Sequence, residues 1–138
     1  MLRDGDFSTQ NSTSAQAVVW QTVPAGVAKR MERQQVLYDG EHRYDVILGE
    51  QALYTYVGGP EVIREQLERL LSEIDLLSLT LGILPATADV DMVPAHGFNM
   101  YDDSHAHYEL VSTGVDISHP AELALHNKAF GLLSDATY

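Results

Sequence analysis

Apolar residues recur with a helical period in the segment GPEVIREQLERLLSEIDLL, which begins at Gly59. Three- and four-residue spacing of this kind is typical of an amphipathic helix. Pro60 presets the backbone of the first turn, so we predict that the helix begins there. The apolar residues expected to share its buried face are Ile63, Leu67, Leu70, Leu71 and Ile74.

Short apolar runs lie on both sides of this predicted helix. RYDVILGE holds an apolar run at residues 46–48 before Gly49, and LTLGILP ends at Pro85. Runs of this length are typical of buried strands. A strand, a helix and a second strand over this distance predict a parallel crossover unit.

Alternating apolar and polar residues then predict an antiparallel hairpin. GFNMYDD and HAHYELVST lie on either side of a turn at residues 102–104, and a further strand is predicted at residues 115–117. Ser118 is the predicted N-cap of a last helix that begins at Pro120. The apolar face of that helix is predicted to contain Leu125, Ala129, Leu132 and Leu133.

The N-terminal region is more polar than the rest of the chain. Residues 1–16 are rich in Ser, Thr, Gln, Asn and Asp, so we predict a mobile leader followed by a single domain at 17–138. A helix is expected between Pro24 and Gly40. The predicted fold class is α/β or α+β, with a mixed sheet of four to five strands, a β-α-β crossover, an antiparallel hairpin and helices packed on the sheet.

Charge and composition exclude several classes of function. Twenty acidic and eight basic residues give a net charge of −12, which argues against nucleic-acid binding by this chain alone. The absence of cysteine excludes disulfides and thiolate-bound zinc. No apolar run approaches the roughly 18 residues needed to cross a bilayer, so we expect a cytoplasmic protein without membrane association.

The stretch NMYDDSHAHYEL carries the clearest polar pattern. His105, His107 and Glu109 share one face if this strand is regular. Two imidazoles and a carboxylate occur in open zinc and iron sites, and His96 lies nearby in the sequence. The leading interpretation is the polar side of a one-sided sheet, so no metal ion is predicted. A ligand pocket and a metal site at these three residues stay open as alternatives.

Aromatic residues indicate a second kind of site. Tyrosine combines apolar area with a hydroxyl, so it suits a pocket for an apolar small molecule, although core packing also explains most of these residues. No nucleophile motif, phosphate-binding loop or dinucleotide fingerprint is present, so no catalytic residue and no cofactor is predicted, and enzyme activity is left open. The candidate ligand-binding residues are Tyr54, Tyr56, His96, Phe98, Tyr101, His105, His107 and Glu109.

Several segments resemble a known family. VAKRMERQQVLYD, RYDVILGEQALYTYVGGPEVIREQLERLL, LTLGILPATA, HGFNMYDD and AHYELVSTG are similar to the C-terminal domain of actinobacterial Xre-type helix-turn-helix regulators. That domain is described as toxin-antitoxin-like and of unknown function. The likeness runs from about Val27 to the C-terminus, and the helix-turn-helix itself is expected to be missing.

The resemblance implies a stand-alone small-molecule-sensing or protein-interaction domain that does not itself bind DNA. Such domains are often encoded beside a small acidic partner protein, and the resemblance implies no catalytic residues. We also expect a homo-oligomer, because helical faces left by the missing domain need cover. The alternative is a small enzyme or binding protein of a biosynthetic pathway, with an apolar substrate held near His and Glu acid–base groups.

Four residues of the matching segments are predicted to have structural roles. Gly58 and Gly59 let the backbone turn sharply before the crossover helix. Glu50 is expected to cap the segment that follows it or to pair with a basic residue such as Arg64. Gln66 lies beside the apolar helical face, where it is expected to bond a loop.

Overall fold

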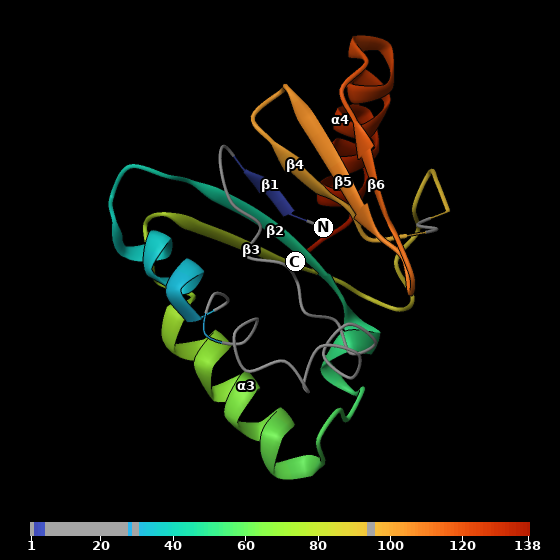
Figure 1. Cartoon of the computed structure of the whole chain (residues 1–138). Coiled ribbons are helices and arrows are strands. Elements are labelled where there is room, and N and C mark those ends of the chain that lie inside the picture. The colour runs from blue at the N-terminus through green and yellow to red at the C-terminus, as the bar shows by residue number, and fades with distance from the viewer. Residues whose placement is uncertain (1, 5–27, 29–30, 94–95) are drawn as a thin grey trace.

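A computed structural model describes residues 2–4, 28, 31–93 and 96–138 of the chain. The strands are β1 (Leu2–Asp4), β2 (Tyr44–Gly49), β3 (Leu79–Leu84), β4 (Asn99–Tyr101), β5 (His105–Glu109) and β6 (Gly114–Ile117). The helices are α3 (Pro60–Glu73) and α4 (Pro120–Asp135), with 3-10 helices η1 (Gln34–Tyr38) and η2 (Glu50–Leu53). In this part of the chain the strands form one mixed sheet in the order β3-β2-β1-β4-β5-β6 (Figure 1), which confirms the predicted fold class.

The predicted crossover is confirmed. β2 and β3 pair in parallel, with Val46 opposite Leu81, and α3 connects them. Gly58 and Gly59 precede α3 with φ angles of 83° and 97°, a region that glycine enters without the steric cost of a Cβ. These two residues reverse the chain before Pro60 begins the helix.

The apolar face of α3 is narrower than the sequence pattern indicates. Ile63, Leu67 and Leu70 are half-buried. Leu71 and Ile74 are 70% and 49% exposed, so their assignment to the buried face is wrong. Leu71 lies to one side of the buried stripe, because successive residues of a helix are about 100° apart. Ile74 is the C-cap, at the point where α3 ends.

The predicted hairpin and the last strand are also confirmed. β4 pairs antiparallel with β5, and β5 pairs antiparallel with β6. The hairpin turn contains Asp102 with a φ of 50°, a conformation that aspartate tolerates better than most residues do. β4, β5 and β6 therefore form a three-stranded meander beside the crossover unit.

A sixth strand comes from the segment that we predicted to be a mobile leader. Leu2–Asp4 form β1, antiparallel to β2 and parallel to β4. Backbone groups of β1 pair on both edges with strands that lie far away in the sequence. The remainder of the predicted leader, residues 5–16, lies outside the described residues.

The helix predicted between Pro24 and Gly40 is described only in part. Residues 31–33 are helical, and η1 follows them directly. A tighter 3-10 turn is common at a helical C-terminus. The Ser78 hydroxyl donates a 2.7 Å hydrogen bond to the Leu37 carbonyl, which fixes η1 to the segment before β3.

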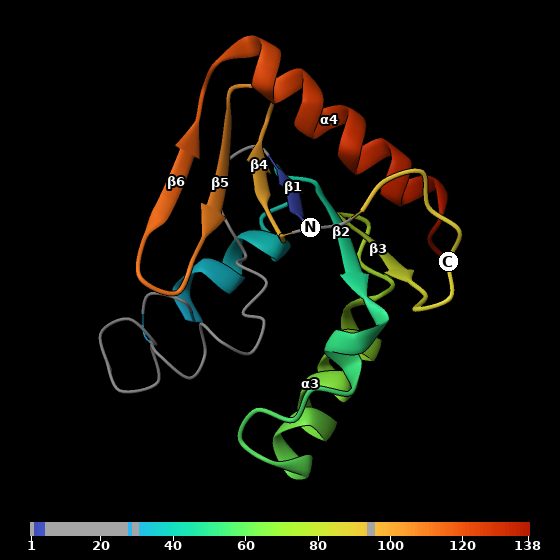
Figure 2. The ribbon, with the colours of Figure 1, turned by 90° about the vertical axis from the view of Figure 1, so that its right-hand side faces the viewer.

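α4 covers one face of the sheet, and α3 lies away from α4 beyond β2 and β3 (Figures 1 and 2). Residues of the sheet and of α4 together form the buried core. Burial of these apolar side chains is the main force that holds α4 on the sheet. The core residues are Ile47, Phe98, Met100, Ala106, Leu123, Phe130 and Leu133.

Two details of α4 differ from the sequence prediction. Leu125 is 67% exposed, whereas Leu123 and Phe130 are buried with Leu133. Leu133 is buried as predicted and Ala129 packs against the core, so the predicted face is wrong at Leu125 and lacks Leu123 and Phe130. Apolar residues occur on several sides of this helix, so periodicity alone does not define the buried face. The N-cap is His119 rather than Ser118, and its Nδ1 accepts a 3.3 Å hydrogen bond from the Ala121 N–H.

The described helices also bear on the expectation about membranes. Among the residues that the structure describes, no helix combines the length and the apolar character that a membrane span requires.

Candidate functional site

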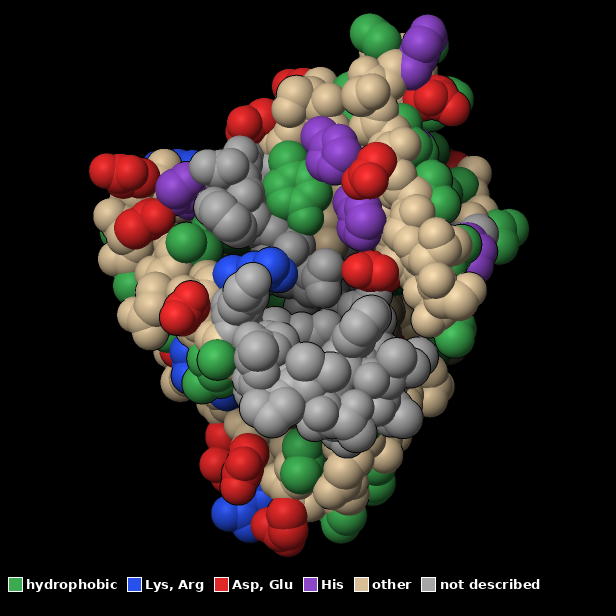
Figure 3. Space-filling view, in the orientation of Figure 1, with side chains coloured by type: hydrophobic (Ala, Val, Ile, Leu, Met, Phe, Trp, Pro, Cys, Tyr) green, Lys and Arg blue, Asp and Glu red, His purple; other side chains and the backbone are tan. Residues whose placement is uncertain are grey.

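The strand β5 separates two kinds of side chain onto opposite faces of the sheet. Ala106 lies in the core with Tyr108 packed against it, and the alternate residues point to the other side. Cross-strand pairing adds residues of β4 and β6 to that side, because directly opposed residues share a face. We call it the polar face and define it by Asn99, Tyr101, His105, His107, Glu109 and Asp116; histidine and acidic side chains gather on it in Figure 3.

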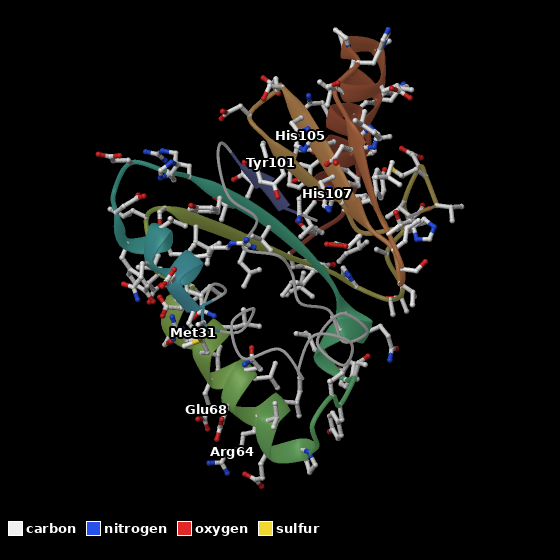
Figure 4. All side chains as sticks on the ribbon, viewed as in Figure 1. Met31, Arg64, Glu68, Tyr101, His105 and His107 are labelled. Carbon is white, nitrogen blue, oxygen red and sulfur yellow. The ribbon has the colours of Figure 1, made fainter. Side chains whose placement is uncertain are left out.

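Two histidines of the polar face share one carboxylate. His107 lies opposite Asp116 across the strand pair, and its Nδ1 is 2.7 Å from Asp116 Oδ1. His105 lies diagonally across from Asp116, and its Nε2 is 3.1 Å from the same oxygen. Figure 4 shows both imidazoles projecting from β5 beside Tyr101. The three side chains form a compact histidine–aspartate cluster.

The hydrogen-bond partners determine which ring nitrogens of this cluster carry a proton. An ionised carboxylate only accepts, so the ring nitrogens that face Asp116 donate their N–H groups. The hydrogen bond from His107 holds the pKa of Asp116 below its ordinary value. Asp116 is therefore an anion at neutral pH, and its side chain is 66% exposed.

Two further polar side chains adjoin the cluster. Glu109 Oε1 lies 3.6 Å from His107 Nε2, which is close enough for an ion pair but longer than a hydrogen bond. The Tyr101 ring lies 5.5 Å from the His105 ring at an interplanar angle of 38°. His107 and Glu109 are 19% and 27% exposed, so solvent reaches the cluster from one side.

Gly114 provides the space in which His107 lies. A Cβ at this position would be 2.7 Å from His107 Cε1 and 3.3 Å from His107 Nε2, which is too close for the ring to stay in place. Gly114 has no left-handed backbone angle that would require glycine. Its lack of a side chain is therefore needed for the position of the imidazole.

A hydrogen-bonded tyrosine–histidine pair lies on the face that α4 covers. Tyr108 Oη is 2.6 Å from His126 Nε2, and His126 Nδ1 is 2.6 Å from the Glu122 carbonyl oxygen. A carbonyl only accepts, so Nδ1 carries the proton of the neutral ring and Nε2 accepts from the Tyr108 hydroxyl. Burial raises the pKa of Tyr108, which keeps that hydroxyl protonated. The Phe98 ring packs edge-on against His126 with a centroid distance of 5.0 Å.

The structure separates the candidate ligand-binding residues that the sequence indicated. Tyr101, His105, His107 and Glu109 lie together on the polar face. Phe98 is buried in the core, whereas His96 is exposed in the loop before β4. In the turn between β2 and α3 lie the two remaining residues, Tyr54 and Tyr56, which are 63% and 62% exposed. These described aromatic residues do not converge on a single pocket.

Glu50 connects two loops. Its Oε2 accepts a 2.6 Å hydrogen bond from the Ala86 N–H, and its Oε1 lies 3.5 Å from the Tyr54 hydroxyl. Arg64, which the sequence offered as a partner, instead bonds Glu68 at 3.1 Å within α3. The Glu50 carboxylate thus joins the turn after β2 to the segment after β3.

The remaining structural predictions concern the start and the surface of α3. A Cβ at Gly58 would lie 3.2 Å from Val62 Cγ2, so a side chain there would crowd the first turn of the helix. Gln66 is exposed on α3.

Asp116 is the central residue that sequence reasoning missed. The signal was the length of the turn between β5 and β6. The Leu110 N–H donates to the Thr113 carbonyl across this turn at 2.8 Å. Counting outward from residues 110–113 puts Gly114 opposite Glu109, and Asp116 opposite His107.

Comparison with known proteins gives one match. The chain matches the family described as a domain of unknown function, DUF5753, over residues 9–137. No curated protein and no solved structure matches it. The matched region contains the crossover, the meander and nearly all of the C-terminal segment. The chain therefore belongs to the DUF5753 family.

Proposed function

We propose that this chain is a small-molecule-sensing or protein-interaction domain, related to toxin-antitoxin-like transcriptional regulators, that does not itself bind DNA. The observation that carries the proposal is the polar face. It presents a phenol, two imidazoles and a carboxylate on a rigid sheet, where the core does not require them. Polar groups held in a fixed arrangement on a scaffold are typical of binding surfaces.

The chemistry of the polar face indicates the kind of group that it would bind. Asp116 is an exposed anion that accepts hydrogen bonds. Tyr101 and His105 present neighbouring rings against which a flat group can pack. A small molecule or a protein segment with a hydrogen-bond donor beside a planar group fits this surface.

The charge of the chain supports the part of the proposal that concerns DNA. The net charge is −12, and Glu109 and Asp116 add negative charge to the polar face itself. Phosphate backbones are repelled by such a surface, and nucleic-acid binding in general depends on clustered Lys and Arg. We expect no gel shift of DNA by the purified chain at physiological salt. A sequence-specific shift would overturn this part.

A thermal-shift screen tests the binding surface. We expect ligands that raise the melting temperature of the wild type and of Asp91→Asn, but not of a Tyr101→Ala, Asp116→Asn double variant. Asp91 is an exposed acidic residue of the loop before β4, so Asp91→Asn matches the change in charge. Ligands that stabilise the double variant as much as the wild type would place binding elsewhere on the molecule and overturn the assignment of the polar face.

A second candidate function, a small enzyme with His and Glu acid–base groups, has one specific observation in its favour. Asp116 binds His107 Nδ1, and a carboxylate in this position orients an imidazole for proton transfer through Nε2. Glu109 is the acidic group nearest to that nitrogen. Substrate turnover that falls in both His107→Ala and Glu109→Ala would favour the enzyme. Turnover that is unchanged in both variants would exclude it.

A further inference from the structure

We propose that His105, His107 and Asp116 together bind a divalent transition-metal ion, with zinc as the reference ion. The proposal goes beyond the sensing or interaction role and does not depend on it, because ion binding is measured with the ion itself. The cluster contributes one ligand atom from each of the three residues, and these atoms all lie within 4.8 Å of one another.

The spacing of the donor atoms fits a small ion. Asp116 Oδ1 is 2.7 Å from His107 Nδ1 and 3.1 Å from His105 Nε2. Ligand atoms around a tetrahedral zinc, with bonds of about 2.0–2.1 Å, lie about 3.3 Å apart. To admit the ion, the two distances to Asp116 need to lengthen by about 0.6 Å and about 0.2 Å. The ligand atoms of the two histidines already lie within 4.8 Å of each other. His105 and Asp116 are 39% and 66% exposed, so rotation of these two side chains provides such a movement.

The types of donor select the class of ion. Two imidazoles and one carboxylate suit zinc, cobalt and similar borderline ions. Calcium and magnesium prefer six or more oxygen ligands, which this cluster does not supply. Three protein ligands also leave a coordination position toward solvent, where water or a ligand can bind.

Glu109 lies where a carboxylate commonly accepts a hydrogen bond from a metal-bound histidine. When Nδ1 of His107 binds the ion, the proton of the neutral ring lies on Nε2. That nitrogen is 3.6 Å from Glu109 Oε1, so a small rotation gives an N–H donor to a carboxylate. Carboxylates in this position fix the ring and raise its basicity as a ligand. Without the ion, ring N–H groups of the cluster donate to Asp116. When the ion binds, these ring nitrogens lose their protons and bind the ion instead.

Gly114 is a second, independent observation in favour of a built site. Its missing Cβ leaves room for the His107 ring, since a Cβ there would lie 2.7 Å from His107 Cε1. The variant Gly114→Ala retains all three donor groups and moves only the ring. A loss of affinity in this variant would therefore show that binding depends on the geometry of the site. General attraction of cations to a chain of net charge −12 would be unchanged.

Isothermal titration of the full chain with zinc tests the proposal. We expect one ion per chain and a loss of affinity of at least about tenfold in His105→Ala, His107→Ala, Asp116→Asn and Gly114→Ala. His96→Ala is the matched control, because His96 is exposed outside the cluster, and its affinity should equal that of the wild type. Wild-type affinity in the four cluster variants, or an equal loss in His96→Ala, would overturn the proposal.

A measurement on the wild type alone guards against variants that fail to fold. In imidazole ring spectra by NMR, one equivalent of zinc should shift the signals of His105 and His107 and leave those of His96 and His126 in place. Calcium at the same concentration should shift none of them. Shifts confined to other histidines, or no shift at all, would overturn the proposal.

Discussion

Histidines on the two sides of β5 have opposite surroundings. On the side that α4 covers, both nitrogens of His126 are engaged, one by the Glu122 carbonyl and one by the Tyr108 hydroxyl. On the polar face, His105 and His107 share a single exposed carboxylate. The comparison teaches that a histidine with both nitrogens bonded to partners fixed by the fold has a structural role. A histidine whose partner is an exposed side chain stays available for binding.

The two faces also differ in what they contribute to stability. The covered face buries Met100 and Leu133 completely, and such burial contributes on the order of 1.5–3 kcal/mol per large apolar side chain. The polar face contributes hydrogen bonds to an exposed carboxylate, and exposed ion pairs add little because water competes for them. Changes on the covered face should therefore affect folding, and changes on the polar face should affect binding.

The largest expected effect is at the core of α4. Leu133→Ala should lower the free energy of unfolding by about 2–5 kcal/mol, because it leaves a cavity at a completely buried position. Leu125→Ala is the matched control on the same helix, since Leu125 is 67% exposed, and should change stability by at most about 0.5 kcal/mol. Urea unfolding measures both. Equal effects would contradict the packing of α4 described here.

Two glycines give the next comparison. A Cβ at Gly82 in β3 would lie 2.7 Å from Thr137 Oγ1 and 3.0 Å from Thr137 Cβ. Backbone hydrogen bonds between Tyr138 and Ile83 hold Thr137 in place, so it cannot move aside. Gly82→Ala should therefore lower the free energy of unfolding by about 1–3 kcal/mol. In Gly114→Ala the added methyl group contacts the His107 ring, which is partly exposed and can rotate. The free energy of unfolding should therefore fall by at most about 0.5 kcal/mol. A larger cost at Gly114 than at Gly82 would reverse the expected order.

A smaller difference is expected between two tyrosines. Tyr108→Phe removes the hydroxyl that donates to His126, which should cost about 1 kcal/mol because a partly buried nitrogen loses its donor. Tyr101→Phe on the polar face should stay within about 0.5 kcal/mol of the wild type. Thermal or urea unfolding near neutral pH provides the test. The interpretation of the Tyr108–His126 pair as part of the packing between β5 and α4 fails if Tyr101→Phe proves the more harmful change.

The smallest effect is the pH dependence of Asp116. Its pKa is lower in the folded chain than the ordinary value of about 3.9 expected after unfolding, mainly because of the hydrogen bond from His107. The stabilisation is therefore present above the unfolded pKa and disappears as the pH falls through the folded pKa. Urea midpoints of the wild type should exceed those of Asp116→Asn near neutral pH, with a gap that closes in acid.

A double-variant comparison tests whether the hydrogen bond from His107 causes the difference in urea midpoint between the wild type and Asp116→Asn. In a His107→Ala background, Asp116→Asn should produce a smaller gap, because the principal hydrogen bond is already gone. A gap of the same size in both backgrounds would show that His107 is not what lowers the pKa of Asp116.

Sequence patterns predicted the parts of the fold that neighbours along the chain create. The crossover and the hairpin follow from apolar runs, turn residues and the period of α3. β1 was missed because its partners, β2 and β4, are far away in the sequence. The buried face of α4 was misjudged at Leu125, since only the position of the sheet selects among several apolar sides.

The candidate site was predictable to a similar extent. Alternation along one strand was enough to put His105, His107 and Glu109 on the same face. Asp116 belongs to the next strand, and its place opposite His107 depends on the length of a turn. Phe98 was grouped with the site residues because its neighbours in sequence are polar, whereas contact with His126 under α4 puts it in the core.

The central position of β1 sets an order for folding. This short strand at the start of the chain separates β2 from β4, and its parallel partner is made only after most of the chain has been synthesised. The crossover unit can pair once β3 has been synthesised, whereas β1 must wait for β4 before both of its edges are paired. We expect the insertion of β1 to be a late step on the ribosome, and the one that joins the two halves of the sheet.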